Sequence, residues 1–159
     1  MGTASSSDES LSARGLRCAI VAARYNGPIV AGLLEGATAA WHRHGGDPAA
    51  LRIEHVPGAF ELPLAAQRFA RAGGWDAVVA LGCVIRGDTA HFDFVAGECA
   101  RGLMRVSLDT GVPVSFGVLT VDTQAQAEER AAPARLDKGG EAMATALAMV
   151  RLLRRIAAP

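Results

Sequence analysis

A polar loop near the middle of this 159-residue chain carries side chains that could do chemistry. Gly87, Asp88 and Thr89 offer backbone N–H groups and a hydroxyl, and His91 follows two residues later. Free N–H groups at a helix start can hold an anion, and an imidazole beside that anion can transfer protons near neutral pH. The loop alone also fits a plainer alternative, a capped helix start with a surface histidine.

The elements on either side of this loop place it where ligands often bind. The apolar run 76–81 before it is typical of a buried strand, and apolar residues after it recur at helical spacing. That helical stripe consists of Phe92, Val95, Cys99, Leu103 and Val106. In open α/β sheets, ligands bind outside the carboxyl ends of strands, which is the position of this loop.

Strands and helices alternate along the rest of the chain. The predicted strands span 17–23, 51–56, 76–81 and 114–119. The predicted helices begin at Pro28, Phe60, His91 and Gln124, and a last one runs from about Lys138 to Ile156. This order predicts an α/β fold in which helices cover both faces of a parallel sheet through right-handed crossovers.

The loops after the first three strands are expected to converge. Tyr25 follows the first strand, residues 58–61 follow the second, and residues 85–91 follow the third. The carboxyl ends of parallel strands meet at one edge, so an aromatic face, a carboxylate, amides, a hydroxyl and an imidazole should gather there. The sequence therefore predicts a small-molecule site at that edge.

Composition argues against several classes of partner. The formal net charge is zero, so nothing indicates a nucleic acid or an anionic membrane as partner. No apolar run approaches the ~18 residues that a membrane-spanning helix needs. The three cysteines, Cys18, Cys83 and Cys99, lack the short spacing of a zinc site or a disulfide framework, which favours reduced thiols and a cytoplasmic location.

The first residues differ in composition from the rest. They are rich in serine, carry Asp8 and Glu9, and lack the apolar segment of a secretory signal. We expect residues 1–14 to form a disordered tail and residues 15–159 to form one domain.

Two helices are apolar over more than one face. In the last helix, Met149 and Leu153 widen the stripe of apolar residues; in the third, Met104 and Leu108 lie outside it. This excess predicts contacts between subunits, although deeper burial within one subunit would also account for it.

Several separated segments resemble the lumazine synthase family. They are Ala23-Arg-Tyr-Asn-Gly27, Val56-Pro-Gly-Ala-Phe-Glu-Leu-Pro63, Ala80-Leu-Gly-Cys-Val-Ile-Arg-Gly-Asp-Thr-Ala-His-Phe-Asp93, Gly117-Val-Leu-Thr-Val-Asp-Thr-Gln-Ala-Gln126 and Asp137-Lys-Gly-Gly-Glu141. The resemblance runs from about Leu16 to Ile156. It implies a flavodoxin-like fold, a three-layer αβα sandwich with a four-stranded parallel sheet, that assembles into pentamers.

The resemblance implies an enzyme of riboflavin biosynthesis. Members of the family condense 5-amino-6-(D-ribitylamino)uracil with 3,4-dihydroxy-2-butanone 4-phosphate and release 6,7-dimethyl-8-ribityllumazine, phosphate and water. The implied steps are imine formation, loss of phosphate, tautomerisation and ring closure, with no cofactor and no metal. Such an enzyme has to hold two substrates side by side, bind a phosphate and move protons.

The resemblance also implies roles for the matched residues on the pyrimidine side. Those expected to contact the pyrimidine and its ribityl chain are Tyr25, Ala59, Phe60, Glu61, Cys83, Val84 and Ile85. Tyr25 would stack on the ring, where the family usually has Phe or Trp. The carboxylate of Glu61 would accept hydrogen bonds from ribityl hydroxyls. The segment 83–85 would hold the edge of the ring through backbone groups.

The matched residues of the central loop would handle the phosphate and the protons. Asp88 and Thr89 take the place of the family's phosphate-binding pair, and His91 takes that of its proton-transfer residue. The carboxylate of Asp88 repels phosphate, so this residue can contribute only its backbone N–H. The neighbouring Arg86 is interpreted as structural.

Three further residues match positions that reach the site from a neighbouring subunit. Phe116 would pack over the ring, Arg130 would clamp the phosphate with a charged fork, and Lys138 would lie nearby. Taken alone, Arg130 and Lys138 also fit solvated surface charges. A homopentamer is the expected unit, with a decamer or a sixty-subunit shell as further arrangements left open.

Three other functions fit part of the sequence. A lumazine- or flavin-binding protein that has lost catalysis would keep Tyr25 but lose His91 or Arg130, and both are present. A structural shell protein predicts a degraded site. An unrelated phosphate binder of the same fold accounts for the order of the elements but not for the matched segments.

Overall fold

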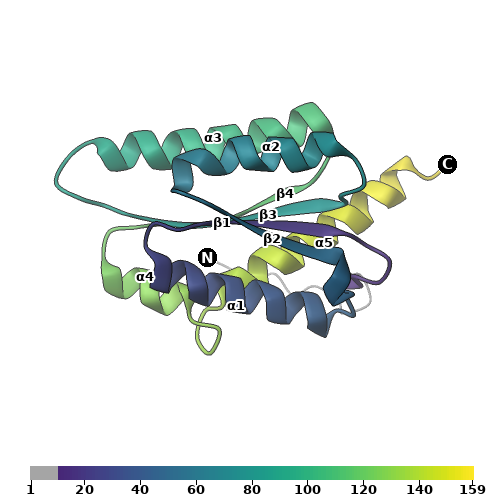
Figure 1. Cartoon of the computed structure of the whole chain (residues 1–159), viewed down its shortest axis with the longest axis horizontal. Coiled ribbons are helices and arrows are strands. Elements are labelled where there is room, and N and C mark those ends of the chain that lie inside the picture. Colours follow the sequence, from purple (N-terminus) through teal and green to yellow (C-terminus); the bar gives the residue numbers. More distant parts are fainter. Residues whose placement is uncertain (1–10) are drawn as a thin grey trace.

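A computed structural model describes residues 11–159, which form a four-stranded sheet between two layers of helices (Figure 1). The strands are β1 (Cys18–Ala23), β2 (Leu51–Val56), β3 (Ala77–Ile85) and β4 (Val114–Val121). They are all parallel and lie in the order β2-β1-β3-β4. The predicted α/β class and the four-stranded parallel sheet are confirmed.

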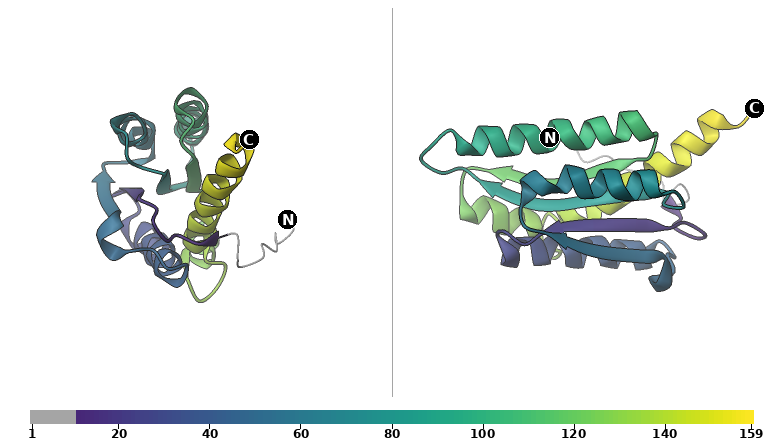
Figure 2. Two further views of the ribbon diagram at one scale, coloured as in Figure 1. Left: turned by 90° about the vertical axis from the view of Figure 1, so that its right-hand side faces the viewer. Right: turned by 45° about the horizontal axis from the view of Figure 1, so that its top comes forward.

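Helices cover both faces of the sheet, as predicted (Figures 1 and 2). The helices α2 (Leu62–Ala72) and α3 (His91–Thr110) pack together on one face. The other face is covered by α1 (Gly27–Arg43), α4 (Gln124–Ala131) and α5 (Lys138–Ala157). Short 3₁₀ turns, η2 (Pro48–Ala50) and η3 (Ala59–Glu61), stand before β2 and α2.

Alternation along the strands divides the core into two halves. In β1, Ile20 belongs to the cluster under α1 and α5, whereas its neighbour Val21 belongs to the cluster under α2 and α3. Successive side chains of a strand point to opposite faces, so a strand that is covered on both sides must be apolar throughout. All six residues of β1 are buried for this reason.

The crossing of α1 and α5 depends on a glycine. A Cβ atom built on Gly139 would overlap the backbone carbonyl of Leu33, so a larger residue would force the two helices apart. We expect Gly139→Ala to lower the free energy of unfolding by about 1–3 kcal/mol or more, because backbone cannot yield as a flexible side chain can. Thermal unfolding measures the change.

Gly97 on α3 supplies the matched control. A Cβ there would approach only the end of the flexible, exposed Arg101 side chain. Gly97→Ala is expected to leave the melting temperature unchanged or to raise it, because alanine is the better helix former. A Gly139→Ala variant as stable as the wild type would contradict the close approach of the two helices.

Strand β3 is longer than the sequence indicates. The predicted strand ends at Leu81, but the observed strand continues to Ile85 because β4 pairs with it as far as Ile85 opposite Val121. Gly82 and Cys83 are therefore strand residues, and the loop before α3 covers only 86–90. The strand brings the segment 83–85 to the carboxyl edge of the sheet.

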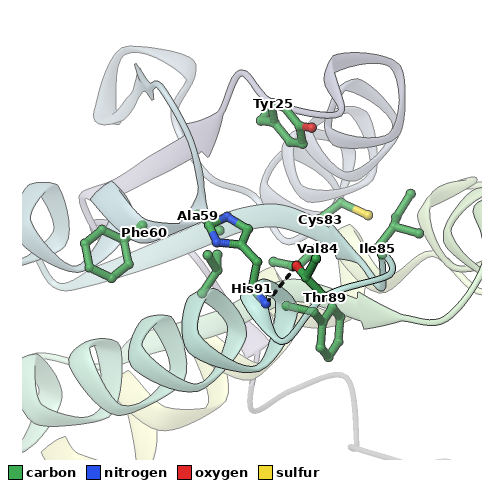
Figure 3. A pocket seen from close by; sticks show the side chains of 11 residues that line it. Tyr25, Ala59, Phe60, Cys83, Val84, Ile85, Thr89 and His91 are labelled. Carbon is green, nitrogen blue, oxygen red and sulfur yellow. Dashed lines mark hydrogen bonds between the residues drawn. The ribbon is translucent and has the colours of Figure 1, made fainter.

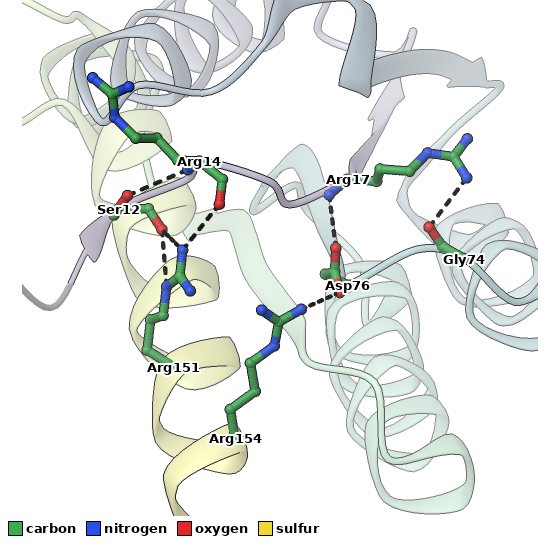
Figure 4. A network of polar contacts seen from close by, with 7 residues as sticks. All are labelled: Ser12, Arg14, Arg17, Gly74, Asp76, Arg151 and Arg154. Atoms are coloured by element: carbon green, nitrogen blue, oxygen red, sulfur yellow. Dashed lines mark hydrogen bonds and ion pairs between the residues drawn. The ribbon is translucent and has the colours of Figure 1, made fainter.

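The packed part of the described chain includes Leu11 and Ala13, which precede the predicted start of the domain at residue 15. The first ten residues of the predicted tail lie outside the described part of the chain, but Leu11 and Ala13 are buried in the core. Arg151 of α5 donates a hydrogen bond of 3.0 Å from Nε to the carbonyl oxygen of Ser12 (Figure 4). The chain just before β1 is also fixed to the rest of the domain, because Arg17 contacts Asp76.

Asp76 ties the start of β1 to the end of α5 (Figure 4). Its carboxylate accepts a hydrogen bond of 2.7 Å from the backbone N–H of Arg17 and forms an ion pair of 2.9 Å with Arg154. The Arg17 guanidinium lies over the ring of Trp75 at 4.3 Å. These contacts lie at the amino edge of the sheet, opposite the predicted site.

The cysteines are buried free thiols. Burial raises the pKa of Cys83 and of Cys99 to about 11, and burial together with the nearby Asp76 raises that of Cys18 to about 12. All three thiols are therefore protonated at neutral pH and poor nucleophiles. Within residues 11–159, no helix has the length and apolar character to cross a membrane. The cytoplasmic location stays a prediction.

Candidate active site

A pocket of about 350 Å³ opens at the carboxyl edge of the sheet, where the predicted loops meet (Figure 3). Tyr25 comes from the loop after β1, and Ala59 and Phe60 come from η3 after β2. The end of β3 supplies Cys83, Val84 and Ile85, and the start of α3 with its preceding loop supplies His91 and Thr89. The predicted convergence of the three loops is confirmed.

Two backbone hydrogen bonds hold the loop after β1 against the loop after β2. The N–H of Arg24 donates to the carbonyl oxygen of Val56 at 2.8 Å, and that of Tyr25 donates to the carbonyl oxygen of Pro57 at 3.1 Å. They continue the β1–β2 pairing beyond the strands. The backbone of Tyr25 is thus fixed although its side chain points out of the core.

Two aromatic rings stand uncovered beside the pocket. The side chains of Tyr25 and Phe60 are 73% and 60% exposed, far more than aromatic rings that serve only as core. Exposed rings at a pocket offer flat faces for stacking on a planar ligand. The alternative interpretation of Tyr25 as a core aromatic is wrong for the single chain.

The central loop links its hydroxyl to the start of α3. Thr89 Oγ1 accepts a hydrogen bond of 3.3 Å from the backbone N–H of His91 (Figure 3). The His91 side chain is exposed and reaches from the first residue of α3 toward the space that the other labelled residues surround (Figure 3). The hydroxyl thus holds the backbone at the start of α3, and Thr89 and His91 both line the pocket.

Arg86 braces this loop from outside the pocket. Its guanidinium pairs with Asp122 at 3.0 Å and with Asp93 at 3.3 Å, and it lies over the ring of Phe92 at 4.2 Å. The residue thus connects the end of β3, the end of β4 and the first turn of α3. Each exposed ion pair is worth little alone, but together with the ring contact they restrict the loop.

Glu61 and Asp88 do not line the pocket of the single chain. A Cβ at Gly58 would lie 3.2 Å from Glu61 Oε2, so the carboxylate folds back over its own turn. Asp88 is exposed between two lining residues, Gly87 and Thr89. Neither residue therefore has its predicted contact surface in the pocket of the single chain.

The three residues expected from a neighbour also lie outside the pocket of their own chain. Phe116 is on the edge strand β4 and is 46% exposed. Arg130 Nη1 on α4 donates a hydrogen bond of 3.1 Å to the carbonyl oxygen of Gln126. Lys138 begins α5 and pairs with Glu141 at 2.6 Å. None of the three side chains lines the pocket of the single chain, so their part in the site stays a prediction.

Two lining residues, Phe92 and Val95, are not predicted as site residues by the sequence, and a third, Gly87, is predicted only as part of the anion-binding loop. The helical spacing places Phe92 and Val95 in the apolar stripe that α3 turns toward the sheet. In the first turn of a helix that starts at a binding loop, the same face also borders the pocket. Their position within four residues after His91 is the signal that the sequence offers.

Comparison with known proteins decides the family. Residues 15–154 match the family model described as 6,7-dimethyl-8-ribityllumazine synthase. The chain is also 53% identical over 146 residues to proteins of that name from two strains of Thermus thermophilus, which covers 92% of this chain and 93% of each relative. The chain belongs to the 6,7-dimethyl-8-ribityllumazine synthase family.

As a member of the lumazine synthase family, the chain is an enzyme of riboflavin biosynthesis. It is a transferase that condenses 5-amino-6-(D-ribitylamino)uracil with 3,4-dihydroxy-2-butanone 4-phosphate, with loss of phosphate and water. The resemblance on which this expectation rested is confirmed. The family match runs from before β1 to residue 154 within α5, so all loops of the pocket lie within it.

Proposed function

We propose that the condensation takes place in the pocket at the carboxyl edge of the sheet, between two subunits. The observation that supports it is the combination, in one 350 Å³ pocket, of exposed aromatic faces, strand-end backbone, a hydroxyl and an imidazole. Small-molecule sites have volumes of roughly 300–1,000 Å³ and a few convergent polar groups. A flat ring with a polyol chain and a short phosphorylated ketone require such a combination.

The pyrimidine substrate binds on the β1 side of the pocket. Its ring stacks on Tyr25, and its edge meets the backbone groups of Cys83, Val84 and Ile85. The ribityl chain runs along Ala59, Phe60 and Glu61, where the carboxylate of Glu61 turns from Gly58 to accept hydroxyl hydrogen bonds. Cys83 contributes a neutral thiol, because burial raises its pKa to about 11.

The phosphorylated ketone binds at the central loop. The hydroxyl of Thr89 and the backbone N–H of Asp88 contact the phosphate, and Arg130 of the partner subunit neutralises it. The amine of the pyrimidine attacks the ketone and water leaves as the imine forms. Phosphate then leaves, and ring closure releases a second water. His91 accepts and returns protons during these steps.

The supporting observation for assembly is an apolar groove between α3 and α5. A hollow of about 450 Å³ is lined by Met104, Leu108, Met149 and Leu153 among others, and these four side chains are 37–77% exposed in the single chain. Single apolar residues are common on surfaces, but a continuous apolar groove is typical of an interface. We propose that a second copy covers it in a homopentamer, which also brings Phe116, Arg130 and Lys138 of the partner subunit to the pocket.

A charge in this groove should break the assembly. Leu108 is 77% exposed, so we expect the Leu108→Glu chain to fold. Its assemblies should have a lower mass than the wild-type oligomer, because burying a carboxylate without a partner at the interface is costly. Size-exclusion chromatography with light scattering measures the mass. Leu64→Glu, at a residue of α2 that is 63% exposed and outside the groove, is the control. An unchanged mass for Leu108→Glu would remove the groove from the interface.

Product formation tests the proposed function. Purified protein is mixed with both substrates and the absorbance of 6,7-dimethyl-8-ribityllumazine is followed against a mixture without protein, since the substrates also react slowly unaided. We expect an acceleration that saturates in each substrate. No acceleration by folded, assembled protein that still binds a lumazine would favour a binding protein on the same scaffold.

A further inference from the structure

Asn26 joins two of the loops that form the pocket. Its side-chain Nδ2 donates a hydrogen bond of 2.9 Å to the carbonyl oxygen of Cys83. The acceptor is a carbonyl, so the nitrogen end of the amide must face it. Tyr25 precedes Asn26 in the chain, and Cys83 lies in the pocket wall. One half-buried amide thus connects the aromatic face to the end of β3.

The sheet itself offers no backbone donor to this carbonyl from β1. The pairing of β1 with β3 ends at Ala22 opposite Leu81, two residues before Cys83. Beyond that point β1 follows β2 instead, since the N–H of Arg24 donates to Val56 at 2.8 Å. The Asn26 amide fills the place that a strand neighbour would take, and an unpaired buried carbonyl would be costly.

The backbone of Asn26 also has a conformation that few residue types adopt easily. Its φ of 56° and ψ of 43° place it in the left-handed region, which Asn, Asp and Gly adopt at lower cost than other residues. Its carbonyl accepts from the N–H groups of Ile29 and Val30 at 3.0 and 3.1 Å and so starts α1. An asparagine at this position usually caps the helix with its side chain, but here the side chain makes no such bond and reaches across to β3.

We propose that Asn26 is a positioning residue for the pyrimidine substrate, which fixes Tyr25 at the spacing from the Cys83–Ile85 edge that one planar ring requires. This inference rests on the proposed function of the pocket. A ring that stacks on one loop and bonds to another binds well only if both loops keep their places, and a shift of about 1 Å is enough to impair such a site. The phosphate end, at Thr89, is anchored separately through α3.

Two variants separate the amide from the backbone. Asn26→Gly keeps the left-handed conformation and removes the side chain, and Asn26→Asp keeps the shape but turns a carboxylate oxygen toward the carbonyl. We expect Asn26→Gly to raise the KM for the ribitylaminouracil about three- to tenfold, which corresponds to one lost hydrogen bond. The KM for the phosphorylated ketone should stay within about twofold, and Asn26→Asp should have an equal or larger effect on the pyrimidine, since like partial charges repel.

Asp47 provides a control at the opposite edge of the sheet. Its Oδ1 accepts a hydrogen bond of 2.9 Å from the N–H of Ala49, so Asp47→Ala also loses one side-chain-to-backbone bond. This variant should lower the melting temperature and leave both KM values unchanged. If both KM values rise equally in the Asn26 variants, or neither rises, the positioning role is wrong.

Binding of 6,7-dimethyl-8-ribityllumazine, followed by its fluorescence, gives a second measurement that needs no catalysis. The dissociation constant should rise about three- to tenfold in Asn26→Gly and stay unchanged in Asp47→Ala. If the wild type binds the lumazine but forms no product, the proposed function is refuted but the inference about Asn26 is not. The fluorescence titration would still test the role of Asn26 in binding. If Asn26→Gly fails to fold, Asn26→Asp serves in both measurements. An unchanged dissociation constant in both variants would overturn the inference.

Discussion

Replacing His91 by alanine should lower kcat by about a hundredfold, because a positioned acid–base group contributes a factor of roughly 10²–10⁴. Imine formation, loss of phosphate and ring closure each move a proton, and the imidazole is the lining side chain best suited to carry it near neutral pH. The KM values should change little, since His91 is exposed and not part of the core. Steady-state rates with both substrates measure the effect.

The control for His91 is another exposed histidine. His42 lies in the last turn of α1, and His42→Ala should keep the wild-type rate. Free imidazole added to His91→Ala should restore part of the lost rate, which a purely structural loss would not permit. A normal kcat in assembled His91→Ala would exclude this residue from proton transfer.

Replacing Arg130 by alanine should raise the KM for the phosphorylated ketone about ten- to hundredfold, because a charge-assisted hydrogen bond is worth roughly 1.5–3 kcal/mol. Arg130 donates from Nη1 to the carbonyl oxygen of Gln126 on its own helix. A guanidinium has five N–H donors, so donors remain for a phosphate. The KM for the pyrimidine should stay near the wild-type value. Titration of each substrate at saturation of the other separates the two constants.

Two variants refine this prediction. Arg130→Lys keeps the charge but not the planar fork and should fall between the wild type and Arg130→Ala. Arg135, an exposed arginine of the linker between α4 and α5, serves as control, and Arg135→Ala should change neither constant. Equal increases of both KM values in Arg130→Ala would contradict a phosphate clamp.

The elements that the sequence predicted best are those with clear local signals at their ends. The strand 51–56 ends at Pro57-Gly58, and the helix 124–131 begins after Thr123, whose hydroxyl accepts a hydrogen bond of 3.2 Å from Gln126 in a capping box. Both have their predicted bounds. Strand β3 has no such end: Gly82 resembles a loop residue, and only the register with β4, a tertiary property, makes it a strand residue.

The same distinction holds for the site. Tyr25 and Cys83 follow from topology, because residues at the ends of neighbouring parallel strands must meet. The position of the Glu61 carboxylate depends on its side-chain rotamer. The hydrogen bond from Asn26 to Cys83 depends on the point at which the pairing of β1 with β3 ends. The role proposed for Arg130 depends on a second subunit. None of these three features is a local property of the sequence.

Mixing two impaired variants tests most directly whether the site is shared between subunits. The assay uses the phosphorylated ketone well below its wild-type KM, where both variants are nearly inactive. His91→Ala and Arg130→Ala chains are unfolded together and reassembled, so that each oligomer contains both. If His91 and Arg130 act across one interface, about a quarter of the interfaces in randomly mixed rings join two intact residues, and about that share of the wild-type activity should return. If both residues serve a site within one chain, every site lacks one of them, and the mixture stays as inactive as its parts.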